Sequence, residues 1–274
     1  MIGSFIASLF VQGLGEAIGM DYMETVNNLA ANAPIGEKNF IKAALCLSHL
    51  CTFILPAFIF LGLTYKKDRW QEMKLKFAPS VQQAFLGGLL ILIAFPLVQF
   101  IFFLNRQLPL PEWALTQEDL INTTIKNLLH VNSSSELLLN LFTIALLPAI
   151  GEELMFRGIL QQTFQKAFKN PHIAIWLTAL VFSFIHFQFQ GFLPRVLLGG
   201  LLGYLFVWTQ NLWVPIIAHL VYNAGQVLLQ YFHQQGVLGI DLNEVEMVPI
   251  WLVGMSILGS SLLVILLRRK QSTV

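Results

Sequence analysis

Long apolar stretches recur along the whole chain, separated by short polar or charged connections. A helix needs about 20 apolar residues to cross a bilayer, and most of these stretches approach that length. The pattern predicts an all-α polytopic membrane protein with about eight transmembrane helices packed as a bundle. The predicted helices cover residues 2–20, 41–64, 81–104, 136–168, 171–188, 192–209, 213–232 and 248–267.

Two of these helices differ from a simple span. The first begins MIGSFIASLF without the basic residues of a signal peptide, so we interpret it as a retained span, although Glu16 interrupts it. The fourth is too long to lie wholly in the membrane, and its second half, LQQTFQKAFKN, is expected to project into water. The run NSSSE is a good cap for the start of the fourth helix. The stretch 105–135 before it is interpreted as a polar connection.

Basic residues predict the orientation, because cytoplasmic loops carry an excess of Lys and Arg. With eight spans, three basic clusters fall on one side and hold ten of the 16 Lys and Arg. That side is then cytoplasmic, together with both termini, and the protein is expected in the cell membrane. The clusters are Lys66, Lys67, Arg69, Lys74 and Lys76; Lys166 and Lys169; and Arg268, Arg269 and Lys270.

Composition narrows the class further. The 274 residues are 56% hydrophobic and only 11% charged, which excludes an ordinary soluble domain, and the net charge of +1 argues against a nucleic-acid partner. Cys46 and Cys51 are five residues apart, about 140° around a helix, so we interpret them as small apolar residues and not as a disulfide or metal pair. We treat 1–274 as a single membrane domain.

A few ionisable residues remain at depth once loops and helix ends account for the others, and Arg195 can extend from the start of its helix to the interface. Intramembrane ionisable residues are costly and usually mark a pathway or a site. The residues that remain are Glu152, Glu153, Arg157, His186 and His219, and less certainly Glu16 and His49.

Their spacing brings several of them together. Glu153 and Arg157 are four apart and can pair on one helix face, whereas Glu152 points about 100° away. His219 and Asn223 also share a face, one turn apart. These groups therefore predict a polar cavity inside the bundle.

The depth of these residues along their helices supports a contact between Glu152 and His186 but complicates one with His219. Glu152 lies 18 residues before Asn170 and His186 lies 16 residues after it, so a hairpin that turns near Asn170 brings the two to similar depth. His219 follows the short connection TQNLW closely, so that connection would have to lie deep. The sequence leaves this conflict open.

Each group alone also has a structural interpretation. A Glu–Arg pair can clamp two helices, and a single membrane His or Asn is more often a packing residue than a catalyst. Five polar groups on three helices, with little other buried charge to pair with, favour one shared functional site.

The three motifs occur in a recognisable order: EELMFR at 152–157, FSFIH at 182–186 and HLVYN at 219–223. This order resembles the CPBP family of intramembrane proteases, also called the CAAX protease and bacteriocin-processing, or Abi, family. The resemblance covers about 136–230, which we expect to be the catalytic core.

The resemblance implies an intramembrane endopeptidase. Peptide hydrolysis needs an activated water and a partner for the developing oxyanion. Glu152 would be the general base, with His186 on the same water, and His219 and Asn223 would donate to the oxyanion. The residues alone do not separate the roles of the two glutamates. The implied catalytic residues are Glu152, His186, His219 and Asn223, with Glu153 and Arg157 in support.

A metal mechanism is the rival. Glu152, His186 and His219 would supply the two-His-one-carboxylate set of some catalytic zinc sites, whereas the zincin pattern His-Glu-x-x-His is absent from the sequence. Family members have been described in both ways. We favour an enzyme without a cofactor and keep zinc as the alternative.

The substrate class and the non-enzymatic alternatives stay open. The eukaryotic branch removes the last three residues of prenylated CAAX proteins, while other members mature peptides or confer immunity to bacteriocins. We expect a membrane-embedded or lipidated protein or peptide as substrate, and Gly199 and Gly203 are expected to pack helices and not to bind lipid. The alternative is a non-catalytic scaffold or bacteriocin immunity protein on the same fold. A transporter is disfavoured, because we find no internal repeat and the charges converge on one cluster.

Overall fold

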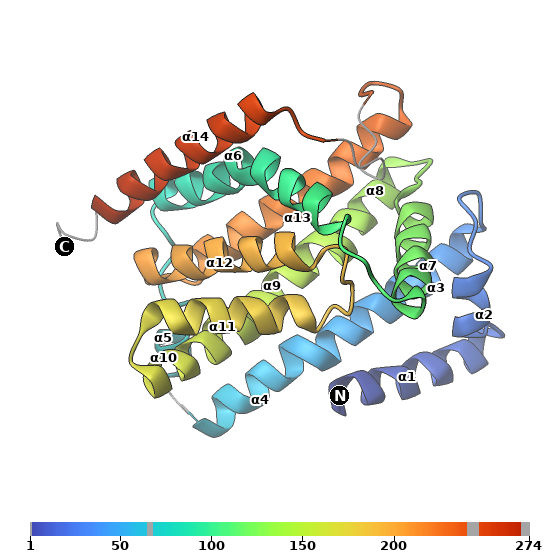
Figure 1. Ribbon diagram of the computed structural model, residues 1–274. Helices are drawn as coiled ribbons and strands as arrows, with labels where there is room; N and C mark the ends of the chain where they lie inside the picture. The colour runs from blue at the N-terminus through green and yellow to red at the C-terminus, as the bar shows by residue number, and fades with distance from the viewer. Residues whose placement is uncertain (1, 65–67, 240–246, 270–274) are drawn as a thin grey trace.

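A computed structural model of the chain describes residues 2–64, 68–239 and 247–269 (Figure 1). All regular elements in these ranges are helical, which confirms the predicted all-α fold. The first half contains α1 (Ile2–Ile18), α2 (Tyr22–Asn27), α3 (Ile35–His49), η1 (Leu50–Ile54), α4 (Leu55–Thr64), α5 (Arg69–Glu72), α6 (Val81–Asn105) and α7 (Glu112–Leu129). The second half contains α8 (Ser134–Asn140), η2 (Leu141–Leu146), α9 (Leu147–Met155), η3 (Phe156–Gln161), α10 (Gln162–Phe168), α11 (Pro171–Phe184), α12 (Phe192–Thr209), α13 (Trp213–Gln234) and α14 (Ile250–Arg269).

The segments η1, η2 and η3 are π-helical turns inside long continuous helices. The predicted second helix therefore runs from α3 through η1 into α4, and the predicted fourth runs from α8 to α10. Apolar periodicity carries no signal for such turns, and they were not predicted.

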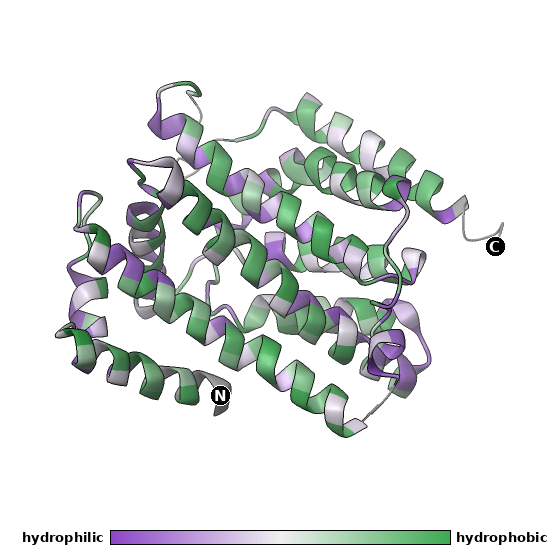
Figure 2. Ribbon diagram, turned by 180° about the vertical axis from the view of Figure 1, so that it is seen from behind, coloured by the Kyte–Doolittle hydropathy of each residue, from purple (hydrophilic) through white to green (hydrophobic). Residues whose placement is uncertain are grey.

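A helix is present at each of the eight predicted spans. By length and composition, five of the described helices can cross a membrane, whereas α1 and α11 are shorter apolar helices and α13 is long but more polar. Figure 2 shows hydrophobic residues along most of the helices and hydrophilic ones mainly at helix ends and connections. The protein is a multi-pass membrane protein. The five candidate spans are Ile35–Thr64, Val81–Asn105, Ser134–Phe168, Phe192–Thr209 and Ile250–Arg268.

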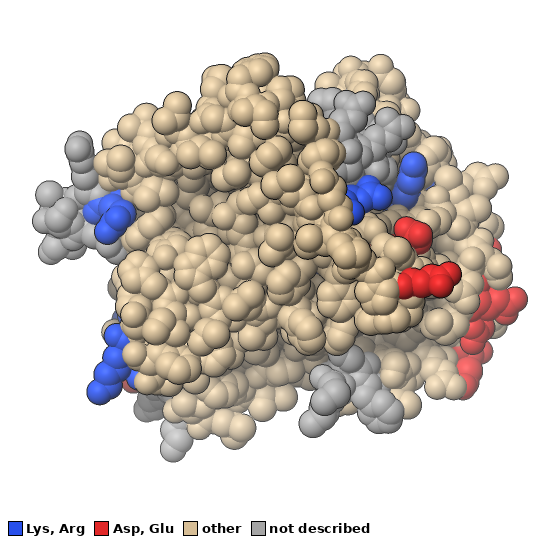
Figure 3. Space-filling view, viewed as in Figure 1, with Lys and Arg blue, Asp and Glu red and all other residues tan. Residues whose placement is uncertain are grey.

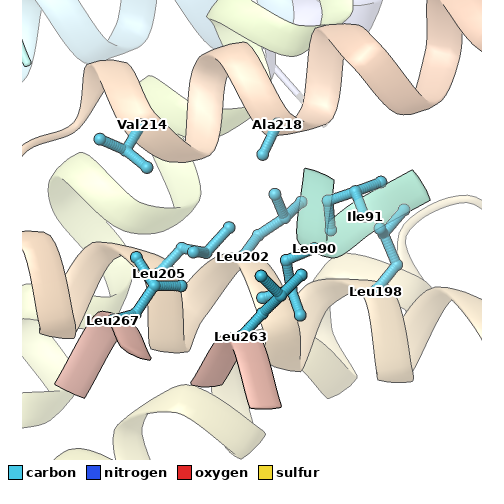
Figure 4. Packing of buried hydrophobic residues seen from close by; sticks show 9 residues of the cluster. All are labelled: Leu90, Ile91, Leu198, Leu202, Leu205, Val214, Ala218, Leu263 and Leu267. Carbon is cyan, nitrogen blue, oxygen red and sulfur yellow. The ribbon is translucent and has the colours of Figure 1, made fainter. Parts of the chain in front are cut away.

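The main apolar core joins α6, α12, α13 and α14. Interdigitated aliphatic side chains from all four helices meet in it, as Figure 4 shows. In a bilayer such contacts stabilise by close packing, because lipid tails are as apolar as leucine. This core fixes α12 and α13 relative to each other. Its members are Leu90, Ile91, Leu198, Leu202, Leu205, Val214, Ala218, Leu263 and Leu267.

The two glycines of α12 pack helices, as predicted. A Cβ added to Gly199 would lie 3.1 Å from Ala179 of α11, and one added to Gly203 would lie 2.9 Å from Ile175. Real Cβ atoms are rarely so close to a neighbour, so a larger residue would push α11 and α12 apart. Glycine therefore sets how closely these two helices approach.

Two local predictions about turns are confirmed. Ser133 caps α8, because its Oγ accepts a hydrogen bond from the Glu136 amide at 3.3 Å. The hairpin between α10 and α11 turns where expected: Lys169 is in the left-handed region and Asn170 accepts from the His172 amide at 2.9 Å.

The interpretation of 105–135 as a polar connection is wrong. Helix α7 occupies most of it and buries Ala114, Glu118 and Leu128 against the bundle. Helix α7 is amphipathic and starts directly after Pro111. Its charged face interrupts the continuous apolar run that marks the other helices in the sequence. Nor is the second half of the fourth helix wholly solvated, since Gln161 is fully buried.

The charges divide between the two ends of the molecule. On the face that Figure 3 shows, Lys and Arg gather near the C-terminal end of α14 and near α5 and α10, while Asp and Glu gather at the opposite end beside a smaller basic group. The described members of the three basic clusters thus share one end. Lys66, Lys67 and Lys270 lie outside the described residues.

We predict that the end carrying Lys166 faces the cytoplasm and the end carrying Gln107 faces outward. Both residues are exposed, so single cysteines at either position are accessible. In a background with Cys46 and Cys51 replaced by Ala, a membrane-impermeant maleimide added to intact cells should label Gln107→Cys and miss Lys166→Cys. The reverse labelling pattern would overturn the orientation.

Candidate active site

The four residues predicted to be catalytic line one cavity of about 480 Å³ between α9, α13 and the end of α11. Helix α9 contributes Glu152, the segment after α11 contributes His186, and α13 contributes His219 and Asn223. The remaining wall is largely apolar, with Phe182 among its residues. The predicted meeting of these four residues is therefore confirmed.

Glu153 lies behind the cavity and joins two helices. One of its carboxylate oxygens, Oε1, accepts a hydrogen bond from Arg157 Nη1 at 2.7 Å and another from His219 Nδ1 at 2.8 Å. The side chains of Glu153 and Arg157 are 0% exposed. The predicted Glu153–Arg157 pair is present, and the bond to His219, which the sequence did not reveal, ties α13 to it.

Arg157 and Gln161 attach this helix to the backbone of α12. Arg157 Nη2 donates to the carbonyl of Gly199 at 2.8 Å, and Gln161 Nε2 donates to that of Gly203 at 3.1 Å. Two side chains four residues apart thus reach two carbonyls that are also four apart. A Cβ at position 203 would lie 2.8 Å from Gln161 Oε1, so glycine there also leaves room for the Gln161 side chain.

Glu152 points the other way, toward the two histidines. Its Oε1 lies 4.0 Å from His186 Nε2 and its Oε2 lies 3.8 Å from His219 Nε2. These separations exceed a direct hydrogen bond but suit a water molecule that contacts both groups. Within the described part of the chain, the Glu152 carboxylate has no other side-chain partner.

The outer nitrogens of both rings are held. His186 Nδ1 lies 2.7 Å from the carbonyl of Phe182, which can only accept, so this nitrogen carries a proton. The same argument applies to His219 Nδ1 against the Glu153 carboxylate. In a neutral ring each Nε2 then carries a lone pair that is directed at Glu152 and the cavity.

The position of His219 follows from the connection before α13, which packs against the loop after α5. The connection before α13 is covered by this loop: Leu212 N donates to the carbonyl of Lys74, and Trp213 Nε1 donates to that of Leu75. Met73 is fully buried beneath it. Leu212 of the connection is thus buried, whereas Gln210 and Trp213 are exposed, and His219 lies about two turns into α13.

The sequence assigned no role to His49, Arg195 or Tyr222, which also line this cavity. His49 lies in the cavity wall and stacks on Phe53 with ring centroids 5.5 Å apart. Arg195 and Tyr222 line both this cavity and a neighbouring polar chamber of about 340 Å³. Glu16 is exposed and lines a separate groove, so it does not belong to the cavity of Glu152.

Residues 134–225 match the family model described as type II CAAX prenyl endopeptidase Rce1-like. This match supports membership of the segment in the CPBP family of proteases. The matched residues include all three motifs and exclude the helices before α8. One relative is an uncharacterized protein of Bacillus subtilis, YpbD, which is 35% identical over 85 residues, or 30% of this chain and 40% of its own length. No solved structure matches the chain.

The donor atoms around Glu152 are spaced more widely than the ligands of a tetrahedral zinc site. In a tetrahedral zinc site the donor atoms lie about 2.1 Å from the ion and hence about 3.4 Å from one another. Here each Nε2 lies 3.8 Å or more from the nearest Glu152 oxygen, and no group of three potential ligands converges among the described residues. The residue types are those of a zinc site, but the spacing leaves room for a water instead.

The buried Glu153–Arg157 ion pair predicts that loss of either partner lowers the stability of the protein. Glu153→Gln leaves the Arg157 guanidinium without its counter-charge at a fully buried position. Removing one partner of such a pair costs about 3–5 kcal/mol. We expect a clearly lower melting temperature in detergent, and partial recovery in the double variant Glu153→Gln, Arg157→Met, because no lone charge remains.

The exposed Glu24 provides a matched control, since Glu24→Gln makes the same chemical change at the surface and should leave the melting temperature unchanged. A Glu153→Gln protein that melts with the wild type would contradict the clamp.

Proposed function

We propose that the protein is an intramembrane endopeptidase that hydrolyses peptide bonds with a water activated by Glu152 and His186. The observation that carries the proposal is the buried Glu152 carboxylate, which faces the Nε2 atoms of two histidines in one cavity. Membership of the matched segment in a protease family supports the same reaction.

The geometry around Glu152 suits an attacking water. A water between Glu152 and His186 donates one O–H to the carboxylate and the other to Nε2, so its oxygen lone pair faces the substrate carbonyl. As the oxygen attacks, Glu152 takes the proton and a tetrahedral oxyanion forms. Glu152 then returns the proton to the leaving nitrogen as the C–N bond breaks, which yields a carboxylic acid and an amine.

The oxyanion needs donors on the opposite side of the reacting carbon. In its doubly protonated form His219 donates to the oxyanion from Nε2, and the Glu153 carboxylate, 2.8 Å from Nδ1, holds the ring in this orientation. Asn223, on the same face of α13, offers a neutral amide donor. This gives His219 a different role from His186, whose outer nitrogen contacts only a backbone carbonyl.

We propose a reaction that needs no metal, because Glu152 and the two rings supply base and donors without one. Metal analysis of the purified protein, together with chelation and metal add-back, tests this. Activity that survives chelation is the expected outcome, and activity lost to a chelator and restored by zinc would replace this mechanism with the zinc alternative.

The substrate is proposed to be a membrane-associated or lipidated protein or peptide, because the cavity that holds Glu152 is walled mainly by apolar side chains such as Phe182 and Leu198. The competing proposal is a non-catalytic scaffold or bacteriocin immunity protein on the same fold. The complete set of base, water-binding ring and donors at one cavity favours the enzyme.

Substitution of the base should separate catalysis from folding. Glu152→Gln keeps the size of the side chain but cannot take a proton, so cleavage should fall at least about a hundredfold with little change in melting temperature. The cleavage rate of a quenched fluorescent peptide that ends in a prenylated cysteine and three further residues measures the first effect. An active Glu152→Gln beside a stable but inactive Glu153→Gln would mean that the two glutamates have the opposite roles.

Natural substrates can be sought by comparing the termini of membrane proteins in wild-type cells and in a Glu152→Gln strain. An endopeptidase predicts termini that are present in the wild type and missing from the variant. If the two strains have identical termini, and the Glu152→Gln strain lacks the phenotype of a strain in which the gene is deleted, the result supports the scaffold instead.

A further inference from the structure

The segment that carries His186 is a short irregular loop between α11 and α12. Phe187, the next residue, has φ of +51°, a left-handed conformation that is uncommon for a bulky side chain. Such a conformation persists only where the surroundings hold it. The position of the His186 ring therefore depends on what fixes residues 187–191.

Asn105, the last residue of α6, binds this loop with its whole amide group. Its Nδ2 donates to the carbonyls of Phe189 and Gln190, each at 2.7 Å, and its Oδ1 accepts from the Leu193 amide at 3.0 Å. The residue is 2% exposed. All three bonds go to backbone atoms of the loop or of the first turn of α12.

Glu118 of α7 binds the same loop from another side. Its two oxygens lie 2.9 Å and 3.2 Å from the amide nitrogen of Gln190, which donates to them, and the residue is 1% exposed. Trp113, also on α7, packs edge-on against Phe189 with ring centroids 5.9 Å apart. Helix α7 thus covers the loop as well as the neighbouring polar chamber.

The proposed reaction makes the placement of this loop chemically important. His186 reaches its water only if Nε2 stays about one water diameter from Glu152, and the present separation is 4.0 Å. A misplacement of about 1 Å can cost a factor of about a hundred in rate. Backbone ties three and four residues after His186 therefore control the geometry that the water needs.

We propose that Asn105 and Glu118 are positioning residues for His186, an inference that rests on the proposed function. They do not line the Glu152 cavity, and both lie outside the segment 134–225. They act through the backbone of residues 189–193, by holding the loop in the one arrangement that aims the imidazole at the shared water. Two helices outside the matched segment thus supply part of the catalytic geometry.

The two residues allow paired substitutions that separate positioning from folding. Glu118→Gln keeps an acceptor oxygen for the Gln190 amide, whereas Glu118→Leu keeps the bulk and removes it. On the prenylated fluorescent peptide we expect kcat to fall about tenfold or more in Glu118→Leu and in Asn105→Leu, with KM changed by less than about threefold. Glu118→Gln should recover most of kcat.

Ser256→Ala is the matched control for a lost buried hydrogen bond. Ser256 of α14 donates to the carbonyl of Ile93, away from the cavity, so its loss tests stability alone. If Glu118→Leu and Asn105→Leu lower the melting temperature as Ser256→Ala does but keep the wild-type kcat, the two residues are structural ties and the proposal is overturned.

A spectroscopic reading of His186 makes the test independent of the cleavage assay. The chain has six histidines, so the imidazole signals of isotopically labelled protein can be assigned with a His186→Gln reference. We expect the His186 signal to shift in both leucine variants and to stay in place in Ser256→Ala. If the His186 signal does not move in the leucine variants, the positioning role is refuted. If it moves in the variants but the wild-type protein cleaves no peptide, only the proposed function is refuted.

Discussion

The arrangement of the site depends on one carboxylate that is wholly removed from water and lipid. Glu153 accepts from Arg157 on its own helix and from His219 on α13, and Arg157 in turn bonds to the backbone of α12. A buried charge is tolerated only where partners surround it, so these bonds are mutually dependent. Without them, three helices would lose the contact that aligns them around the cavity.

This dependence explains why adjacent glutamates have different surroundings. Successive helical positions point about 100° apart, so one carboxylate is directed into the clamp and the other into the cavity. Glu153 Oε1 accepts from both Arg157 and His219, whereas Glu152 faces the two Nε2 atoms across a gap of 3.8–4.0 Å. The clamp also orients a ring of the cavity, because the bond to Glu153 fixes which nitrogen of His219 is presented.

Sequence patterns predicted the helices well, because apolar length is a local quantity, and the few ionisable residues at depth pointed to the meeting of Glu152, His186, His219 and Asn223. They failed at α7, whose amphipathic face is buried only by distant helices. They also missed the His219–Glu153 bond and the loop held by Asn105, since both join segments far apart in the chain. The π-helical turns η1, η2 and η3 left no mark in the apolar period. Such turns are frequent near functional sites, and residues of η1 and η2 line the cavity.

The attachment of Arg157 and Gln161 to helix α12 has a consequence for how such a site can vary. Their acceptors are main-chain carbonyls, which every amino acid possesses, so no particular polar side chain is required opposite them. What α12 must supply at position 203 is the absence of bulk, because a Cβ there would lie 2.8 Å from Gln161 Oε1. The helix that carries Arg157 and Gln161 therefore needs particular polar side chains, whereas α12 needs only small ones. No compensating charge is needed on α12, while a methyl group added at position 203 would force the Gln161 side chain to shift.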